Sequence, residues 1–307
     1  MPVHPAVPAD VPTLIEAYRQ TVSSFADVGE GLRPQEWELP TTCPGWSTRD
    51  HLAHVVHIES YLAGMEHPGG DASVPSPAPA APAVTVGDPP HVRNDFGVWN
   101  EEGVLARRDR DPAGLLAELR TLMEVRSAAM YTPELTLETP VRSVMGLDGP
   151  FGPVTQHRLI DIWAHEQDLR DAVGRPGSLD SPGASTYVQA ILDALPRLVV
   201  RRVRPEPGTV VILESTGPVN GRGGVRVGLD AEGALVGHEL FTGHTGADDV
   251  RPSVDDDSHD RTTTIALSTS ALARRAAGRV STAETAYNVT GDEDLARQVL
   301  EALVLTP

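Results

Sequence analysis

The stretch HRLIDIWAHEQD, residues 157–168, predicts a buried helix that carries one polar stripe. Its polar residues recur at spacings of 4, 4 and 3, which places them on one helix face: His157, Asp161, His165 and Asp168. The intervening residues are largely apolar, so most of the remaining helix surface should be buried. A buried carboxylate needs a cationic partner or a metal ion. Asp161 and His165, one turn apart, can present an oxygen and a nitrogen to the same ion.

A second helix supplies candidates for the facing side. It should begin at Ser47, an N-cap that forms a capping box with Asp50, and run to Gly64. Its histidines recur in steps of three, at His51, His54 and His57, and the first and last point about 240° apart at 100° per residue. At most two of them can therefore face the core, and His54, flanked by apolar residues, is the best single candidate.

One histidine with an Asp-x-x-x-His pair gives three protein ligands. Three ligands leave a coordination position open, the pattern of catalytic rather than structural zinc. The alternative is a set of hydrogen-bonded core residues, because Asp-x-x-x-His is a weak pattern and is not the His-Glu-x-x-His signature of zinc proteases. His157 is a reserve ligand if the Asp161 side chain is too short to reach the ion.

The first part of the chain reads as a helical bundle. Apolar residues at helical spacing and capping signals predict helices near residues 14–29, 47–64, 93–108, 112–130 and 154–173. Residues 68–90 form a low-complexity connection rich in proline and alanine. Four main helices with one long connection are typical of a bundle.

After about residue 192 the pattern changes to short strands. Strands are expected at 210–213 and 262–267, a hairpin at 224–238, and helices at 268–277 and from 291 onward. The predicted fold class is therefore α+β with two domains. A helical bundle should occupy residues 1–192 and a small α+β domain residues 193–307.

Composition excludes several function classes. The 307 residues carry a formal charge of −18 and contain no lysine, so Schiff-base, pyridoxal-phosphate and Walker A chemistry are excluded. The acidity argues against nucleic acid as a partner, and no apolar run is long enough to predict a membrane span. Cys43, the single cysteine, permits no internal disulfide, which is typical of a cytoplasmic protein. We expect a cytoplasmic monomer or homodimer.

Three motifs together resemble one known family. CPGWSTRDHLAH, residues 43–54, resembles the opening motif of the mycothiol-dependent maleylpyruvate isomerase-like family of actinobacteria. DIWAHEQD, residues 161–168, resembles its second motif, Glu-x-x-x-His-x-x-Asp. Residues 277–279 and 288–292 are similar to parts of its sterol-carrier-like second domain. The resemblance implies a DinB-like metal-binding four-helix bundle followed by a sterol-carrier-like domain.

The resemblance also implies a chemistry and a set of site residues. It implies a divalent metal, usually Zn²⁺, bound by His54, Asp161 and His165, with mycothiol as a second cofactor. Asp168 would be an active-site residue, and Arg279 a catalytic residue that contacts the thiol or the substrate. The implied reaction is cis–trans isomerisation of, or thiol transfer to, a small electrophilic acid. Aspartate stands at position 161 where the family usually has glutamate.

A rival hypothesis is a non-catalytic protein that binds a metal or a small ligand, with a role in stress. The shorter side chain at Asp161 and the low aromatic content, 4%, favour this alternative. Within the first motif, we interpret Cys43 as structural, because the family's reactive thiol comes from its cofactor. Trp46 is interpreted as a core anchor beside the N-cap.

Overall fold

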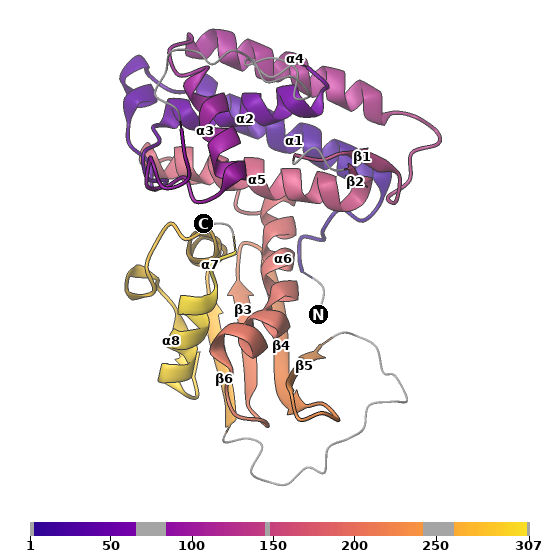
Figure 1. The fold of residues 1–307 in the computed structure, drawn as a ribbon, viewed down its shortest axis with the longest axis vertical. Helices are drawn as coiled ribbons and strands as arrows, with labels where there is room; N and C mark the ends of the chain where they lie inside the picture. The colour runs from indigo at the N-terminus through magenta and orange to yellow at the C-terminus, as the bar shows by residue number, and fades with distance from the viewer. Residues whose placement is uncertain (1–2, 66–83, 145–147, 242–260, 306–307) are drawn as a thin grey trace. The chain divides into compact units, whose positions relative to one another are not determined.

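The computed structural model describes residues 3–65, 84–144, 148–241 and 261–305. The chain divides into two compact units (Figure 1). Residues 8–178 form the helical unit, and residues 179–307 form the α+β unit together with the first seven residues. The α+β class and the order of the two parts are as predicted. The low-complexity segment falls largely outside the described residues.

Four long helices build the helical unit: α1 (Val11–Glu30), α2 (Thr48–Leu62), α4 (Pro112–Met130) and α5 (Phe151–Ala172). Figure 1 shows them running alongside one another, with α1 packed on α4 and α5, and α2 packed on α4 and α5. The shorter α3 (Asp95–Leu105) packs on α2. A 3₁₀ turn, η1 (Pro34–Glu38), precedes α2, and a two-stranded sheet, β1 (Pro140–Arg142) with β2 (Asp148–Pro150), precedes α5.

Local sequence signals set the ends of these helices. Ser47 caps α2 and forms the predicted capping box with Asp50, and Asp111 caps α4 ahead of Pro112 at its first turn. The apolar stripes of the four long helices then meet in one core, centred on side chains such as Tyr18, Phe25 and Leu159. This core lies wholly within residues 8–178 and holds α2 against α5.

The α+β unit is a five-stranded sheet with the strand order β5-β4-β3-β6-β7. The strands are β3 (Val210–Thr216), β4 (Asn220–Leu229), β5 (Leu235–Leu240), β6 (Thr262–Leu267) and β7 (Asn288–Thr290). Only the β3–β6 pair among them is parallel. Helices α7 (Thr269–Ala276) and α8 (Glu293–Ala302) pack on β6, and a π-helical turn, η2 (Val199–Val203), follows α6 (Pro182–Leu198).

The predicted boundary at 192/193 is corrected by the structure, because it falls inside α6. The compact units divide at Ser178/Leu179, and α6 packs on β3, β4 and β5. Gly221 and Gly223 of β4 allow this close approach, since a Cβ at either position would lie 3.0–3.1 Å from Leu192. Residue His4 joins the same unit by pairing its backbone with that of Asn220.

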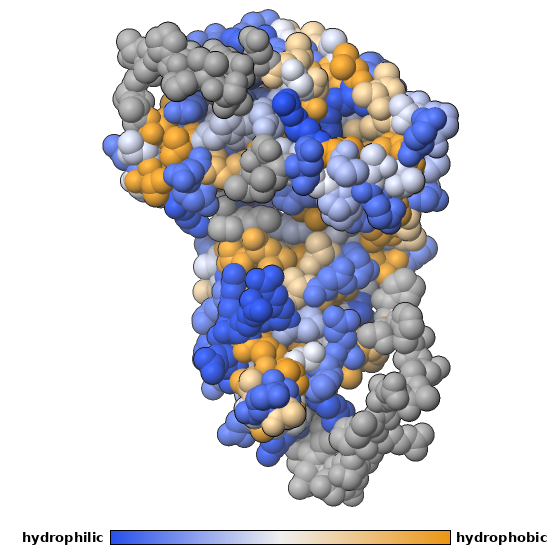
Figure 2. Space-filling model, turned by 45° about the vertical axis from the view of Figure 1, so that its right-hand side comes forward, coloured by the Kyte–Doolittle hydropathy of each residue, from blue (hydrophilic) through white to orange (hydrophobic). Residues whose placement is uncertain are grey.

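The surface carries no helix suited to a bilayer: among the described residues, none combines the necessary length and hydropathy. Hydrophilic and hydrophobic residues are interspersed over the face drawn in Figure 2. The buried histidines of the described chain all belong to the helical unit: His51, His54, His57 and His165. Its interior is therefore where we expect the chemistry.

Candidate metal centre

Helices α2 and α5 bring the three predicted ligands together. His54 projects from α2, and Asp161 and His165 project from successive turns of α5. His54 Nε2 lies 3.3 Å from Asp161 Oδ2, and His165 Nε2 lies 3.7 Å from Asp161 Oδ1. One ligand-type atom from each residue lies within 4.8 Å of the other two. Two imidazole nitrogens and a carboxylate oxygen are a donor set that fits a three-ligand Zn²⁺ site.

The protonation of His54 suits metal binding. The residue is 3% exposed, and burial lowers its pKa to about 4, although the nearby Asp161 carboxylate acts in the opposite direction. The imidazole is therefore neutral at pH 7 and keeps a nitrogen lone pair for a cation. Its other nitrogen, Nδ1, is buried without a hydrogen-bond partner among the described residues. The ring orientation is thus set by packing and by Asp161, not by a polar group behind it.

Asp161 is shared between the candidate ligands and an arginine. Arg158, one turn earlier in α5, donates from Nη1 to Asp161 Oδ2 at 2.8 Å. Burial raises the pKa of Asp161, but the Arg158 guanidinium and the two imidazoles hold it well below its usual range. The carboxylate is therefore ionised and able to bind a cation. Arg158 occupies the oxygen nearest His54, so the opposite oxygen, Oδ1, is the less encumbered one.

A buried ionic network fixes Arg158. Glu59 of α2, fully buried, accepts hydrogen bonds from Arg158 Nε at 3.0 Å and from the Tyr18 hydroxyl at 2.6 Å. It also pairs with Arg126 of α4. Burial raises the pKa of Glu59, and the two guanidiniums outweigh that effect and lower it. The network ties the four long helices α1, α2, α4 and α5 together behind Asp161 and holds Arg158 in place.

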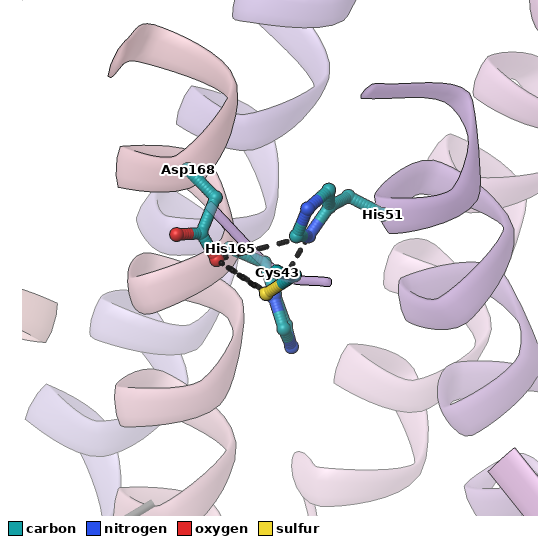
Figure 3. Close-up of side chains that lie close together, drawn as sticks. All are labelled: Cys43, His51, His165 and Asp168. Carbon is teal, nitrogen blue, oxygen red and sulfur yellow. Dashed lines mark hydrogen bonds and ion pairs between the residues drawn. The ribbon is translucent and has the colours of Figure 1, made fainter. Parts of the chain in front are cut away.

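A second group of ligand-type side chains adjoins the first. It consists of Cys43, His51, His165 and Asp168, all buried, which converge in Figure 3. His165 Nδ1 lies 2.9 Å from His51 Nδ1 and 3.3 Å from Asp168 Oδ2, and the Cys43 thiol donates to the same carboxylate oxygen at 3.4 Å. His165 therefore belongs to both groups, with Nε2 facing Asp161 and Nδ1 facing Asp168.

Two residues of the opening motif belong to the site although we interpreted them otherwise. Cys43 contacts Asp168, and the Trp46 ring lies 5.1–5.8 Å from the rings of His51, His54 and His165. Trp46 Nε1 is anchored by Glu101 of α3 at 2.8 Å. The tryptophan thus forms a wall of the candidate metal centre. The only sequence signal for this was the closeness of both residues to the start of α2.

The remaining predicted residues lie elsewhere. His157 is exposed on α5, and His57 packs on Trp99 of α3, so the structure brings neither into the two groups. Arg279 belongs to the α+β unit, where its Nη1 donates to the Ala277 carbonyl at 2.9 Å. Its role toward a thiol or a substrate stays a prediction.

A cavity of about 450 Å³ lies beside the second group. Cys43 and Trp46 line it, together with Arg108, which pairs with Asp50, and Arg49, which pairs with Glu38. It opens to the surface of the helical unit and gives a small polar molecule or an ion access to the Cys43 side.

Comparison with known proteins gives a consistent result. Residues 18–170 match the family model described as mycothiol maleylpyruvate isomerase N-terminal domain. The crystal structure of the mycothiol-dependent maleylpyruvate isomerase resembles this chain with a TM-score of 0.51 at 15% identity, covering 91% of this chain and 92% of that one. A crystal structure of a mutant of that isomerase matches with the same score and coverage at 14% identity.

At this level of identity the structural likeness concerns the fold, and it extends over nearly the whole chain. No curated protein matches the sequence significantly. The family match contains every residue of both groups of ligand-type side chains, which lie on α2, on α5 and in the segment before α2. Through residues 18–170, the chain belongs to the family of the mycothiol maleylpyruvate isomerase N-terminal domain.

Proposed function

We propose that this protein is a divalent-metal-binding, mycothiol-dependent enzyme that isomerises a cis double bond in, or transfers a thiol to, a small electrophilic acid. His54, Asp161 and His165 would hold the metal, which we propose to be Zn²⁺. The observation that carries the proposal is the meeting of these three side chains from α2 and α5, at 3.3 and 3.7 Å. Family membership and the likeness to the isomerase structures support the same conclusion.

The residues around the ligands have separate tasks. A bound divalent cation lowers the pKa of a thiol or water that it coordinates and so supplies a nucleophile at neutral pH. Asp168, 3.3 Å from His165 Nδ1, orients the His165 ring and keeps Nε2 directed at Asp161. Trp46 excludes water from one side of the three histidines. We assign to Arg279 the pairing with a substrate or thiol carboxylate, a task that arginine performs in bidentate geometry.

The test combines metal content, thiol binding and turnover. Metal-free protein is reconstituted with Zn²⁺, mycothiol binding is measured by calorimetry, and maleylpyruvate is offered as the probe substrate. We expect His54→Ala to lose metal and to lose turnover by about 100-fold or more, as removal of a metal ligand should. His157→Ala, an exposed histidine on α5, is the matched control and should stay close to the wild type. Undiminished mycothiol-dependent turnover by metal-free His54→Ala would reject the proposal.

One observation favours a second candidate function, a non-catalytic metal-binding protein. Arg158 donates to Asp161 Oδ2, which leaves fewer free lone pairs on a carboxylate that is already one methylene shorter than glutamate. For this candidate we expect stable metal binding without calorimetric binding of mycothiol. We also propose a cytoplasmic location, because Cys43 is the single cysteine and permits no internal disulfide.

A further inference from the structure

We infer that Cys43, His51, Asp168 and the Nδ1 edge of His165 form a second metal site, one that contains a thiolate. The four side chains come from α5, from α2 and from the segment just before α2. They place a sulfur, two nitrogens and a carboxylate oxygen within 4.8 Å of one another. The proposed function places its metal on the opposite edge of His165 and uses Asp168 only to orient that ring, so this inference does not rest on it.

The separations fit a single ion at the centre of the group. Bonds of about 2.0–2.3 Å to four tetrahedral ligands imply ligand-to-ligand distances of roughly 3.3–3.8 Å. The structure gives 3.4 Å from Cys43 Sγ to Asp168, 3.3 Å from His165 to Asp168, and 3.8 Å from His51 to Asp168. The distance between His51 Nδ1 and His165 Nδ1, 2.9 Å, is shorter than this range. The two rings must therefore move slightly apart when both bind the ion.

The contacts of His51 allow a tautomer that directs a lone pair into the group. Its Nε2 lies 2.8 Å from the hydroxyl of Thr41, and that hydroxyl donates its own proton to the Trp46 carbonyl at 3.1 Å. In the tautomer with Nε2–H, His51 donates to the Thr41 oxygen, and His51 Nδ1 keeps the lone pair that a metal ion needs. A polar partner on the outer nitrogen is the arrangement that orients a metal-ligating histidine.

The ligand types indicate which ion the site takes. A thiolate with imidazole nitrogens selects Zn²⁺ and similar thiophilic ions over Mg²⁺ and Ca²⁺, which prefer oxygen ligands. The ion displaces the Cys43 thiol proton to solvent. The proton of His165 Nδ1 moves to Nε2, beside Asp161, or to solvent when Nε2 also binds an ion. Cys43 also lines the 450 Å³ cavity, which supplies an entry path for the ion.

The single cysteine makes the test direct. Metal-free full-length protein is titrated with Co²⁺ under reducing conditions, and thiolate-to-cobalt charge-transfer absorption is recorded in the near ultraviolet. Any such band reports Cys43, because the chain has no other thiol. We expect the band in the wild type, its loss in Cys43→Ser and in His51→Ala, and its retention in His54→Ala, which removes a ligand of the other group only.

Two results would overturn the inference. One is a wild type without the band at saturating Co²⁺, which needs no variant to interpret. The other is a band that survives in both His51→Ala and Asp168→Asn, since it would show that Co²⁺ binds the Cys43 thiolate without the other ligands. As a second measurement, Zn²⁺ should slow alkylation of Cys43 in the wild type by about tenfold or more, because the bound thiolate is no longer free to react. An unchanged alkylation rate would count against the site.

The inference and the proposed function fail independently. A protein that shows the charge-transfer band but no mycothiol-dependent turnover keeps the second metal site and loses the proposed enzyme activity. A protein that turns over and lacks the band keeps the activity and loses the second site.

Discussion

His54 shows at the residue scale how burial prepares a side chain for function. Its imidazole is almost completely enclosed, and burial lowers its pKa to about 4. A neutral histidine is the form that binds metal. The same burial makes the residue costly to protonate, so a functional ligand is also a source of acid sensitivity in the metal-free protein.

We therefore predict a pH-dependent stability that His54 controls. The pKa is about 6.5 in the unfolded chain and about 4 in the folded one, so the unfolded state binds more protons between these values. The stabilising contribution is complete above pH 6.5, falls steadily as the pH is lowered from 6.5 to about 4, and is fully lost below that. Between pH 7 and pH 5 the free energy of unfolding of the metal-free protein should fall by about 2 kcal/mol on account of His54.

Urea unfolding in the presence of a chelator measures this effect at both pH values. His54→Ala should lose most of that pH dependence, whatever its absolute stability. An equal fall in the wild type and in the variant would contradict the prediction. The depressed pKa of Asp161 does not interfere, because that carboxyl is ionised throughout this range in the folded state.

At the scale of elements, α4 carries two arginines in contrasting environments. Arg126 is 9% exposed and pairs with the buried Glu59 of α2, whereas Arg120 is 32% exposed and pairs with Asp27 and Glu30 of α1. Breaking a buried pair leaves an uncompensated charge, but an exposed pair is screened by water.

We predict that Arg126→Met lowers the free energy of unfolding by about 3 kcal/mol. Arg120→Met, on the same helix, should change it by less than about 1 kcal/mol. Urea denaturation at pH 7 compares the two variants. Similar effects in both would show that the Glu59 network adds no more than a surface ion pair.

The contact between α3 and α2 depends on a glycine. A Cβ at Gly103 would lie 2.3 Å from the ring of His57, so an alanine there must push the helices apart or displace the ring. A Cβ at Gly114, in the first turn of α4, would instead point into open space, with no described atom within 4 Å apart from its own stretch of helix. A change of glycine to alanine is therefore sterically crowded at Gly103 and unhindered at Gly114.

We predict that Gly103→Ala destabilises the protein by about 1–3 kcal/mol through overpacking. Gly114→Ala should instead stabilise it by up to about 1 kcal/mol, because alanine has the higher helix propensity. Thermal or urea unfolding should show a lower free energy of unfolding for Gly103→Ala and a higher one for Gly114→Ala than for the wild type. A stabilising Gly103→Ala would mean that His57 moves aside freely.

At the scale of the whole molecule, the proposed metal binding and the proposed contact with thiol or substrate belong to different units. The hydrophobic core of the four long helices lies within residues 8–178, and the same unit contains both groups of ligand-type residues. Arg279, to which we assign contact with the thiol or substrate, belongs to the other unit. Metal binding and thiol chemistry should therefore be separable by removing one unit.

We predict that a chain of residues 8–178 alone binds metal with the stoichiometry of the full protein and lacks mycothiol-dependent turnover. Elemental analysis and the maleylpyruvate assay test the two halves of this statement. The full-length Arg279→Ala variant is the companion measurement and should show a comparable loss of turnover with normal metal content. Turnover by residues 8–178 alone would exclude a necessary role for Arg279.

The sequence by itself determined the features that depend on neighbours along the chain. The capping box of Ser47 with Asp50, the start of α4 at Pro112 and the stripe from Asp161 to Asp168 follow from spacings of three and four residues. The α+β class and the order of the two parts follow from the change of periodicity. All of these are local, so a single sequence is sufficient to read them.

Only the tertiary structure decided which distant groups meet. The rotation of α2 against α5 places both His51 and His54 beside His165, and it brings Cys43 to Asp168 and Trp46 over the histidines. The packing of α6 on β4 moves the unit boundary from 192/193 to 178/179. The physical reason is that such contacts depend on helix rotation and on space left by glycines, which arise from the packing of the whole core and not from spacing along one helix.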